Sequence, residues 1–395
     1  MSTAIVKTNN LYDAHNQWAS RPDDERYGSL EELHKAALAY YNQSTESTIE
    51  YRDLKVELFA DDDDIALIGK SGKPAALTYT ASKQLCQRIG APHEYISRLS
   101  PGLAATNIQY GLINLETDKS AKLLFYNGGD RLAIRAFTGE GYARIWHHEL
   151  TERVLNLRDD GWRLPPARPA SKSVKGVRPA TKADILGDND FSLSVKEGDL
   201  IAPAGAYLGQ GWPELFIFVV EPTQAIQSKQ GRMLHRFAMI SNSEIGDAKL
   251  RVKFGLYDHV CGNHILWNVE DVYEVAIKHS GGARKRAFEE LSMSFTTYSN
   301  IDLKVEEQRV FKAQNYKLGD KKEEILDYLF GKKIAGKKEL VKAWDIADAK
   351  VDSYGSPTTA WGFANGLTEL SQQSTYTDER VALDNAAAKV IQFAF

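Results

Sequence analysis

Three consecutive runs decide the fold: LFIFVVEP (215–222), RFAMIS (236–241) and LRVKFGLYDHVC (250–261). Each run is short and rich in β-branched and aromatic residues, which is typical of strands. Another such run, FSLSV (191–195), precedes them. Turn glycines separate the runs, at Gly205, Gly209, Gly211 and Gly246. Together they predict a mixed or antiparallel sheet as the core of the protein.

On the N-terminal side of this sheet, helical and strand patterns alternate. Ser29-Leu30-Glu31-Glu32 has the form of a capping box and predicts a helix over about residues 30–42. Further helices are expected for ASKQLCQRI (81–89, capped by Thr80), PHEYISRL (92–99) and TERVLNLRDD (151–160). Two hairpins are expected, one from YRDLKVELFA (51–60) with DIALIG (64–69) and one from KLLFYN (122–127) with RLAIRAFTG (131–139).

On the C-terminal side, the sequence after Arg284 is helical in pattern. The expected helices are KRAFEELSMSF (285–295) with an amphipathic stretch through Gln308, EEILDYLFG (323–331), KKELVKAWDIADA (337–349), and a last helix containing TTAWGFANGLTELSQQ (358–373). The fold class is therefore α+β, with a β-rich mixed or antiparallel sheet core, a helical N-terminal region and a helical C-terminal third. The expected divisions are an N-terminal α+β region (1–160), a basic Pro-rich loop or linker (161–186), the β-rich core (187–282) and a helical region (283–395).

Composition excludes several classes of protein. The chain has 395 residues, of which 43% are hydrophobic and 26% charged, which is the balance of a globular protein. No apolar run approaches a membrane span, and the N-terminus lacks a signal-peptide pattern, so we expect a cytoplasmic protein of a bacterial host with no membrane partner. The two cysteines, Cys86 and Cys261, cannot form a disulfide framework or a four-thiolate zinc site, and we expect both to be reduced.

Two short motifs suggest chemistry that their surroundings do not support. Gly69-Lys70-Ser71 resembles a phosphate loop, but Asp64 stands where the Walker pattern requires a glycine, so a polar hairpin turn is expected. The run Asp61 to Asp64 could attract a cation, but adjacent carboxylates on one loop converge poorly, and a solvated charge run is the preferred interpretation.

The histidines form two small groups. On a strand, His259 and Cys261 share a face, and a turn at Gly262 could bring His264 towards them. Packing of a small buried thiol is the favoured interpretation, and a zinc site completed by His235, His279 or Glu244, or another polar role, stays open. The second group, His147-His148-Glu149, lies where a strand pattern gives way to a helix. We predict no metal and no cofactor.

Positive charge is concentrated in two segments. Residues 161–182 contain four prolines and six Lys or Arg without an acid, and residues 278–286 place cations where a glycine turn enters a helix. Cations at a helix N-terminus oppose the macrodipole unless an anion such as phosphate binds there. A solvated helix entrance is the preferred interpretation, and a phosphate site stays open. Aromatic residues for base stacking are Trp212, Trp267, Tyr142 and Trp146. The candidate nucleic-acid-binding residues are Arg163, Arg168, Lys172, Lys175, Arg178, Lys182, Lys278, Arg284, Lys285, Arg286, Tyr142 and Trp146.

Several segments resemble one family. They are Asn242-Ser243-Glu244-Ile245-Gly246, Val260-Cys261-Gly262-Asn263 with Trp267, and Lys278-His279, with upstream and downstream pieces LCQRIGAPHEYISRL (85–99), RAFTGEGYARIWHHEL (135–150) and TTAWGFANGLTEL (358–370). Over roughly residues 75–375 the chain is similar to the phage and plasmid proteins grouped as domain of unknown function 932. His264 stands where that pattern has an arginine. The resemblance implies a protein of phages and other mobile genetic elements, often encoded near genes of DNA metabolism.

Three functional hypotheses follow. The first is a non-enzymatic protein of phage type that binds single-stranded DNA, or anneals it, as a homo-oligomer in DNA recombination. The second is a module that binds a host or phage protein, either against a host defence or as a scaffold. The third is an enzyme acting on nucleic acid or nucleotide through the region of Asn242, Glu244, His259, Cys261 and His264. For the pair Asn242 and Glu244 we prefer a structural role, in which the two side chains lie side by side and hold a turn through backbone hydrogen bonds.

Overall fold

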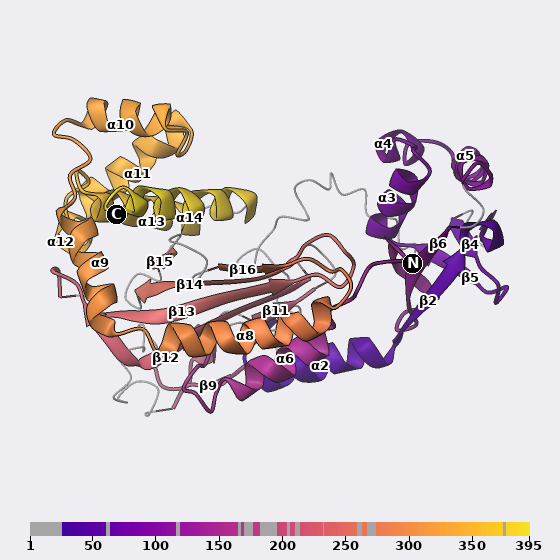
Figure 1. Ribbon diagram of the computed structural model, residues 1–395, viewed down its shortest axis with the longest axis horizontal. Helices are drawn as coiled ribbons and strands as arrows, with labels where there is room; N and C mark the ends of the chain where they lie inside the picture. The colour runs from indigo at the N-terminus through magenta and orange to yellow at the C-terminus, as the bar shows by residue number, and fades with distance from the viewer. Residues whose placement is uncertain are drawn as a thin grey trace.

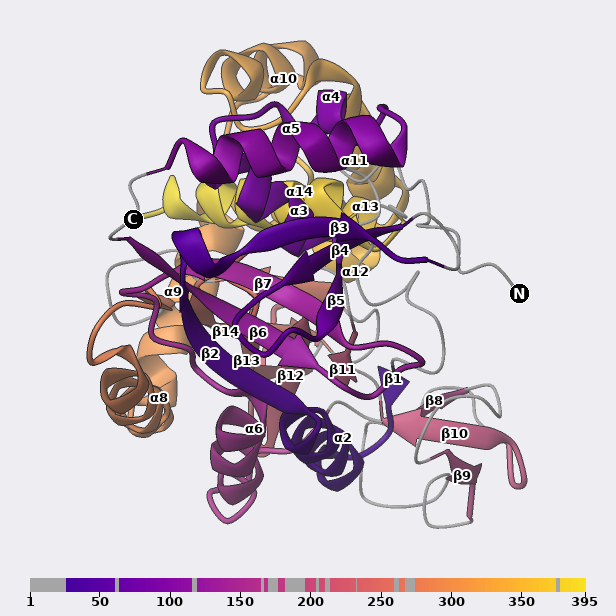
Figure 2. The same ribbon diagram turned by 90° about the vertical axis from the view of Figure 1, so that its right-hand side faces the viewer.

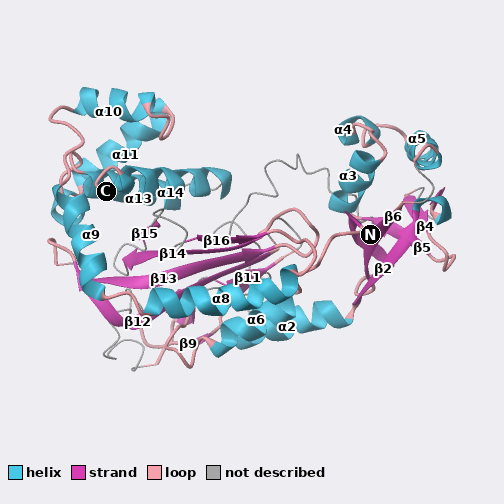
Figure 3. Cartoon of the chain, viewed as in Figure 1, coloured by secondary structure: helices cyan, strands magenta, loops and turns pink. Residues whose placement is uncertain are grey.

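The structure is a computed structural model of the whole chain, and it describes residues 26–60, 64–115, 119–164, 167–169, 177–181, 196–203, 206–209, 214–231, 233–258, 263–266, 274–373 and 377–395. Strands and helices are both abundant and are arranged in separate layers, so the predicted α+β class is confirmed (Figures 1 and 3). All statements below refer to these residues.

The central element is a seven-stranded sheet in the order β1-β11-β12-β13-β14-β15, with β16 also paired to β14. Every pairing is antiparallel, which resolves the predicted alternatives in favour of antiparallel. Its long strands contain the first two runs that predicted it and residues 250–258 of the third, while residues 259–261 and the run at 191–195 lie outside the described residues. The strands are β1 (Arg26–Tyr27), β11 (Ala206–Leu208), β12 (Leu215–Gln227), β13 (Met233–Asn242), β14 (Leu250–Asp258), β15 (Asn263–Leu266) and β16 (Glu274–Ile277).

Helices cover both faces of this sheet. Residues alternate across a strand, so Lys253 and Phe254 of β14 point to opposite faces. Phe254 packs against Phe295 of α8 (Ala283–Ser299), while Lys253 Nζ donates to Asn385 Oδ1 of α14 (Thr377–Gln392) at 3.0 Å. Figure 1 shows α2, α6 and α8 below the sheet and α13 and α14 above it.

A second, six-stranded sheet follows the order β2-β6-β7-β5-β4-β3. Both predicted hairpins are present in it, as the antiparallel pairs β3·β4 and β6·β7, and a single parallel pairing, β5·β7, makes this sheet mixed. Gly69-Lys70-Ser71 lies in the hairpin turn between β4 and β5, as predicted, and Gly72 N–H donates to Gly69 C=O at 3.0 Å. The strands are β2 (Ser44–Glu50), β3 (Lys55–Leu58), β4 (Ile65–Ile68), β5 (Pro74–Leu77), β6 (Ser120–Tyr126) and β7 (Ala133–Gly139).

The expected linker is partly folded. Within it, β8 (Ala167–Pro169) and β9 (Arg178–Pro179) pair on either side of β10 (Leu200–Pro203) to form a three-stranded antiparallel sheet. The prediction of a loop or linker over 161–186 was therefore incomplete. Prolines fit here because each of these short strands needs few ladder hydrogen bonds.

The N-terminal helices agree with their sequence signals in most respects. Helix α2 (Leu30–Asn42) begins where predicted, and Ser29 Oγ accepts from Glu32 N–H at 3.1 Å. Helix α3 (Tyr79–Arg88) is capped by Thr78, not by the expected Thr80. Helix α6 (His147–Asn156) starts earlier than expected, so its first turn contains the His147-His148-Glu149 group. The short α4 (His93–Ile96) follows Pro92, and α5 (Pro101–Ile113) has no counterpart among the sequence predictions.

The C-terminal third is helical, as predicted. Helices α8 and α9 (Leu303–Asn315) are separate, and they are followed by α10 (Lys322–Gly331), α11 (Lys337–Ala349), α12 (Val351–Tyr354), α13 (Ala360–Gln373) and α14. The predicted last helix is thus followed by one more. An alanine-rich segment such as 386–388 carries little amphipathic contrast, which explains why its pattern was missed.

The described residues form two large hydrophobic cores and two small clusters, one around Phe237 and one that joins Leu124, Ala136 and Ile245 where the sheets meet. The larger one joins the seven-stranded sheet to the C-terminal helices and also includes Leu33 of α2 and Leu150 of α6. The smaller one lies under the six-stranded sheet and contains Leu85, Ile108 and Phe137. Because α2 and α6 belong to the larger core, the region 1–160 does not pack as a separate unit.

Candidate functional site

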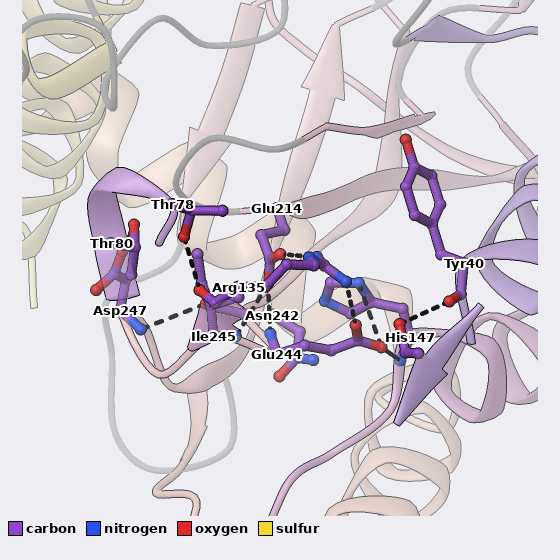
Figure 4. A network of polar contacts seen from close by, with 12 residues as sticks. Tyr40, Thr78, Thr80, Arg135, His147, Glu214, Asn242, Glu244, Ile245 and Asp247 are labelled. Carbon is purple, nitrogen blue, oxygen red and sulfur yellow. Dashed lines mark hydrogen bonds and ion pairs between the residues drawn. The ribbon is translucent and has the colours of Figure 1, made fainter. Parts of the chain in front are cut away.

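The two sheets meet at a buried network of charged and polar side chains. It joins Arg135 of β7, the segment from Tyr142 to His147, Glu214 just before β12, and the Asn242–Gly246 turn just after β13 (Figure 4). Arg135, Arg144, His147, Glu214, Asn242 and Glu244 are all buried. Buried charges are tolerated only when paired, so each partner here is expected to matter.

Glu214 lies at the centre of this network. One carboxylate oxygen pairs with Arg135, and the other accepts hydrogen bonds from Glu244 N–H at 2.6 Å and Ile245 N–H at 3.1 Å. Ser243 Oγ donates to the same oxygen at 3.4 Å. Glu214 therefore holds the turn after β13 and connects it to β7 of the other sheet.

Asn242 and Glu244 both reach the same backbone segment. Asn242 Nδ2 donates to Ile145 C=O at 2.9 Å, and Glu244 Oε1 accepts from His147 N–H at 2.6 Å. Both side chains therefore form backbone hydrogen bonds, as the structural interpretation expected, and these bonds reach the segment before α6. The Glu244 carboxylate also lies 3.6 Å from Arg135 Nη1 and 3.6 Å from His147 Nδ1. Burial opposes its charge, but His147 and Arg135 outweigh this and lower the pKa of Glu244.

Aromatic and cationic groups complete the junction. The Tyr142 ring stacks on His279, with centroids 5.0 Å apart, and the Arg144 guanidinium lies 5.1 Å from the Tyr142 centroid. Burial raises the pKa of Tyr142, and burial together with Arg144 lowers the pKa of His279 to about 4. His279 is therefore neutral at physiological pH.

This network links the two sheets through contacts between buried charged and polar groups. Glu244 and His147 are each at most 3% exposed. Among the residues described, no group of three or more His, Cys, Asp or Glu side chains is arranged to hold a metal ion. For the His259, Cys261 and His264 cluster, only the backbone of His264 lies in a described segment, in β15 opposite Tyr257. Of the acidic run, residues 61–63 likewise lie outside the described ranges.

A pocket of about 290 Å³ lies close to this network, behind Arg135. The Arg135 guanidinium is 5.8 Å from the ring centroids of both Tyr40 and Tyr126, and those two rings, 5.6 Å apart, form part of the pocket wall. Its lining residues are Tyr27, Glu32, Lys35, Ala36, Ala39, Tyr40, Gln43 and Tyr126.

No sequence pattern predicted this pocket, although the spacing of residues on helix α2 indicates part of its lining. Lys35, Ala39 and Gln43 recur at helical spacing, and the small residues Ala36 and Ala39 leave space on that face. Tyr126 comes from a distant strand, and only the pairing of β2 with β6 brings it next to this helix.

The predicted basic residues are distributed over more than one surface. Arg163 and Arg178 are exposed, and Arg168 lies in β8 opposite Ala202 of β10. Six of the residues that the sequence singled out lie outside the described ranges: Lys172, Lys175, Lys182, Trp212, Cys261 and Trp267. Asn263 begins β15, opposite Asp258.

The second basic segment lies elsewhere. Four exposed basic residues lie at or just before the start of α8: Lys278, Arg284, Lys285 and Arg286. Arg284 pairs with Glu149 of α6. Figure 2 shows α8 and the three-stranded sheet on opposite sides of α2 and α6. The described strands of the first segment and the start of α8 therefore lie apart. Tyr142 and Trp146, proposed for base stacking, pack instead against His279 and Tyr41.

A further basic surface had no counterpart in the sequence predictions. Four exposed lysines lie around the turn between α10 and α11, beside Phe330, which is 50% exposed. They are Lys332, Lys333, Lys337 and Lys338. Lys337 pairs with Asp327 at 3.1 Å. Lys332 and Lys333 directly follow α10, and Lys337 and Lys338 begin α11, so the charge is already clustered in the sequence.

The fold and the site define an α+β protein in which two sheets are joined by a buried ion-pair network and bordered by an aromatic pocket. Comparisons with protein-family models, with curated proteins and with solved structures find no match. In the described ranges, no helix combines the length and apolar character needed to cross a membrane.

Proposed function

We propose that the protein binds single-stranded nucleic acid, with the α2 pocket as a base-binding site and the three-stranded sheet as a contact for the phosphate backbone. The observation that carries the proposal is the pocket itself, which combines three tyrosines with one lysine. Aromatic faces that stack on bases, next to positive charge that follows the backbone, are the usual means of binding single strands.

The pocket has the size and chemistry for one base. Its volume of about 290 Å³ is at the small end of ligand pockets. Lys35 is exposed on its rim and can pair with a phosphate, while the Gln43 amide and the Glu32 carboxylate can form hydrogen bonds with the edge of a base. Arg135, held by Glu214, fixes Tyr40 and Tyr126 from behind, so the rings need little reorganisation on binding.

The basic three-stranded sheet is close to the pocket along the chain. Strand β10 ends at Pro203, and β11 begins at Ala206, which pairs with the pocket residue Tyr27. Ala202, opposite Arg168, is four residues before Ala206, a distance of roughly 13 Å at most in extended chain. A strand of a few nucleotides can therefore span from the pocket to Arg168 and Arg178.

A pocket-filling substitution tests the base site. We expect Ala39→Trp, which places a ring inside the pocket, to weaken binding of a fluorescent oligo-dT at least tenfold by anisotropy. The matched control is Leu38→Trp, on the same helix, exposed and outside the lining. Equal affinities of the two variants would remove the pocket from the binding site.

Salt dependence tests the binding of the phosphate backbone. Replacing Arg163 and Arg178 together by alanine is expected to reduce the slope of log affinity against log salt by about 0.7 for each phosphate that the variant no longer neutralises. The control removes two charges from the α10–α11 turn, with Lys332→Ala and Lys333→Ala. A slope that changes with the control and not with the arginine pair would move the backbone-binding surface to that turn.

The resemblance to domain of unknown function 932 supports a wider setting for this activity. We propose a protein of a phage or other mobile element that acts in DNA recombination in the bacterial host cytoplasm. The residues that carry the resemblance include Asn242, Glu244 and Gly246, which form the turn at the sheet junction. Relatives encoded repeatedly beside DNA recombination genes would support this setting, and relatives confined to unrelated chromosomal operons would contradict it.

A further inference from the structure

We infer that the outer face of α5 is a self-association surface, which pairs with the same face of a second copy of the chain about a two-fold axis. Three large apolar side chains on this face are exposed to solvent: Leu103 by 57%, Tyr110 by 71% and Ile113 by 67%. They recur at spacings of seven and three residues, so they form one stripe along the helix.

The helix cannot rotate to hide this stripe. Its opposite face is buried in the smaller core through Ala104, Ile108 and Leu112. At Gly111 the backbone approaches Ile89 so closely that an added Cβ would lie 2.7 Å from the Ile89 side chain. The orientation of α5 is therefore fixed with its apolar stripe outward.

Three polar side chains of the same face each donate one hydrogen bond within the helix. Thr106 Oγ1 donates to Gly102 C=O at 2.8 Å, Asn107 Nδ2 to Leu103 C=O at 2.8 Å, and Asn114 Nδ2 to Tyr110 C=O at 2.7 Å. These donors turn back to the helix and do not depend on water for a partner. Covering the face consequently leaves few unpaired donors, which lowers the cost of burying it.

The absence of charge points to a second copy as the occupant. From Leu99 to Leu115 the sequence contains no Asp, Glu, Lys or Arg, although 26% of the chain is charged. A surface without charge meets itself without repulsion, as a two-fold interface requires. A membrane-surface helix would carry Lys or Arg beside its apolar face, and a charged partner would find no complementary group.

Two-fold symmetry fixes the pairing. An antiparallel pair centred between Thr106 and Asn107 places Leu103 against Tyr110 of the second copy, and Tyr110 against Leu103. Thirteen residues give a contact about 20 Å long, shorter than most stable interfaces offer, so the dimer is expected to be weak. Figure 2 shows α5 and α2 on opposite sides of the six-stranded sheet, so this pairing leaves the α2 pocket uncovered.

Sedimentation velocity of the full chain between about 1 and 200 µM tests the inference, with a dissociation constant expected on the order of 10–100 µM. The wild type should pass from monomer to dimer over this range. Tyr110→Glu, which sets two like charges into the interface, should stay monomeric with an unchanged circular dichroism spectrum. The matched control is Met293→Glu, at a residue 65% exposed on α8, and it should dimerise as the wild type does.

Three results would overturn the inference. They are a wild type that is monomeric at 200 µM, a dimer that persists in Tyr110→Glu, and a dimer equally absent in Met293→Glu. Anisotropy with oligo-dT at protein concentrations below 1 µM separates this interface from the nucleic-acid proposal, since each can fail without the other.

Discussion

Glu214 is the residue on which the junction between the sheets depends most. It is fully buried. Its two carboxylate oxygens accept hydrogen bonds from Arg135, from the Ser243 hydroxyl and from two backbone N–H groups of the turn. Glu244, which the sequence singled out, has fewer bonds: it accepts from one backbone N–H and lies further from Arg135. A carboxylate with more partners leaves more groups unpaired when it is removed.

We therefore expect Glu214→Ala to destabilise the protein more than Glu244→Ala does. Loss of Glu214 leaves the buried Arg135 without its closest partner and should cost about 3–5 kcal/mol, the usual range for breaking a buried ion pair. Glu244→Ala should cost about 1–3 kcal/mol, and Glu244→Gln less, because the amide oxygen can still accept from His147 N–H. Urea denaturation of the three variants measures this order, and a Glu244→Ala variant less stable than Glu214→Ala would contradict it.

His279 adds a pH dependence at the same junction. Its pKa is lowered to about 4 by burial and by Arg144, so between its ordinary value of 6.5 and about 4 the unfolded chain binds a proton that the folded chain does not. Stability must then fall as pH drops through this window, by at most about 1.4 kcal/mol per pH unit for one proton.

His279→Phe isolates this effect, since it keeps a ring for stacking on Tyr142 and cannot titrate. We expect the stability of the wild type relative to this variant to decline from about pH 6.5 towards about pH 4.5 and to be constant above about pH 7.5. Urea denaturation at four pH values measures it. A constant difference throughout would mean that His279 charges freely in the folded protein.

At the scale of elements, helix α13 packs unusually close to α11. A Cβ added at Gly366 would lie 2.1 Å from the backbone oxygen of Ala343, so only glycine allows this approach. Backbone cannot move aside as a flexible side chain can, and an inserted methyl group must separate the helices.

Gly366→Ala is accordingly expected to destabilise the protein by about 1–3 kcal/mol or more, in spite of the higher helix propensity of alanine. Gly331→Ala, at the end of α10 where an added Cβ meets nothing within 4 Å, is the matched control and should have a much smaller effect. Thermal melting compares the two, and equal melting temperatures would show that α11 and α13 can separate without cost.

For the molecule as a whole, the notable feature is the polar connection between two hydrophobic cores. The larger core and the smaller core are distinct, and the network of Arg135, Glu214 and Glu244 lies between the sheets that carry them. Such a connection couples the unfolding of the two cores only while its charges are paired.

Arg135→Met should uncouple them. Trp162, Trp344 and Trp361 belong to the larger core, whereas Trp146 packs against Leu124 and Ala136 of the six-stranded sheet. Tryptophan fluorescence recorded in a Trp146→Phe background is therefore weighted towards the larger core, whereas circular dichroism reports on both. We expect the two urea transitions to coincide in the wild type and to separate in Arg135→Met. Coincident transitions in the variant would show that apolar packing alone couples the cores.

Local patterns in the sequence determined most of the elements. A few neighbouring residues determine each of these features: the cap at Ser29, the two hairpins and the β-rich runs. All of them are found in the structure. Helix α5 and the cap at Thr78 escaped prediction. A helix without charge shows little amphipathic contrast, and Thr78 and Thr80 are equally suitable caps until β5 fixes where the strand ends.

Only the tertiary structure decided how distant residues combine. The sequence pointed to Asn242 and Glu244 but not to Glu214 or Arg135, because their pairing depends on where two sheets meet. It likewise could not show that the three-stranded sheet and the start of α8 lie apart or that Tyr126 joins Tyr40 in one pocket. Secondary structure follows from interactions between near neighbours, whereas a site depends on contacts between residues far apart in the chain, and no local pattern encodes those.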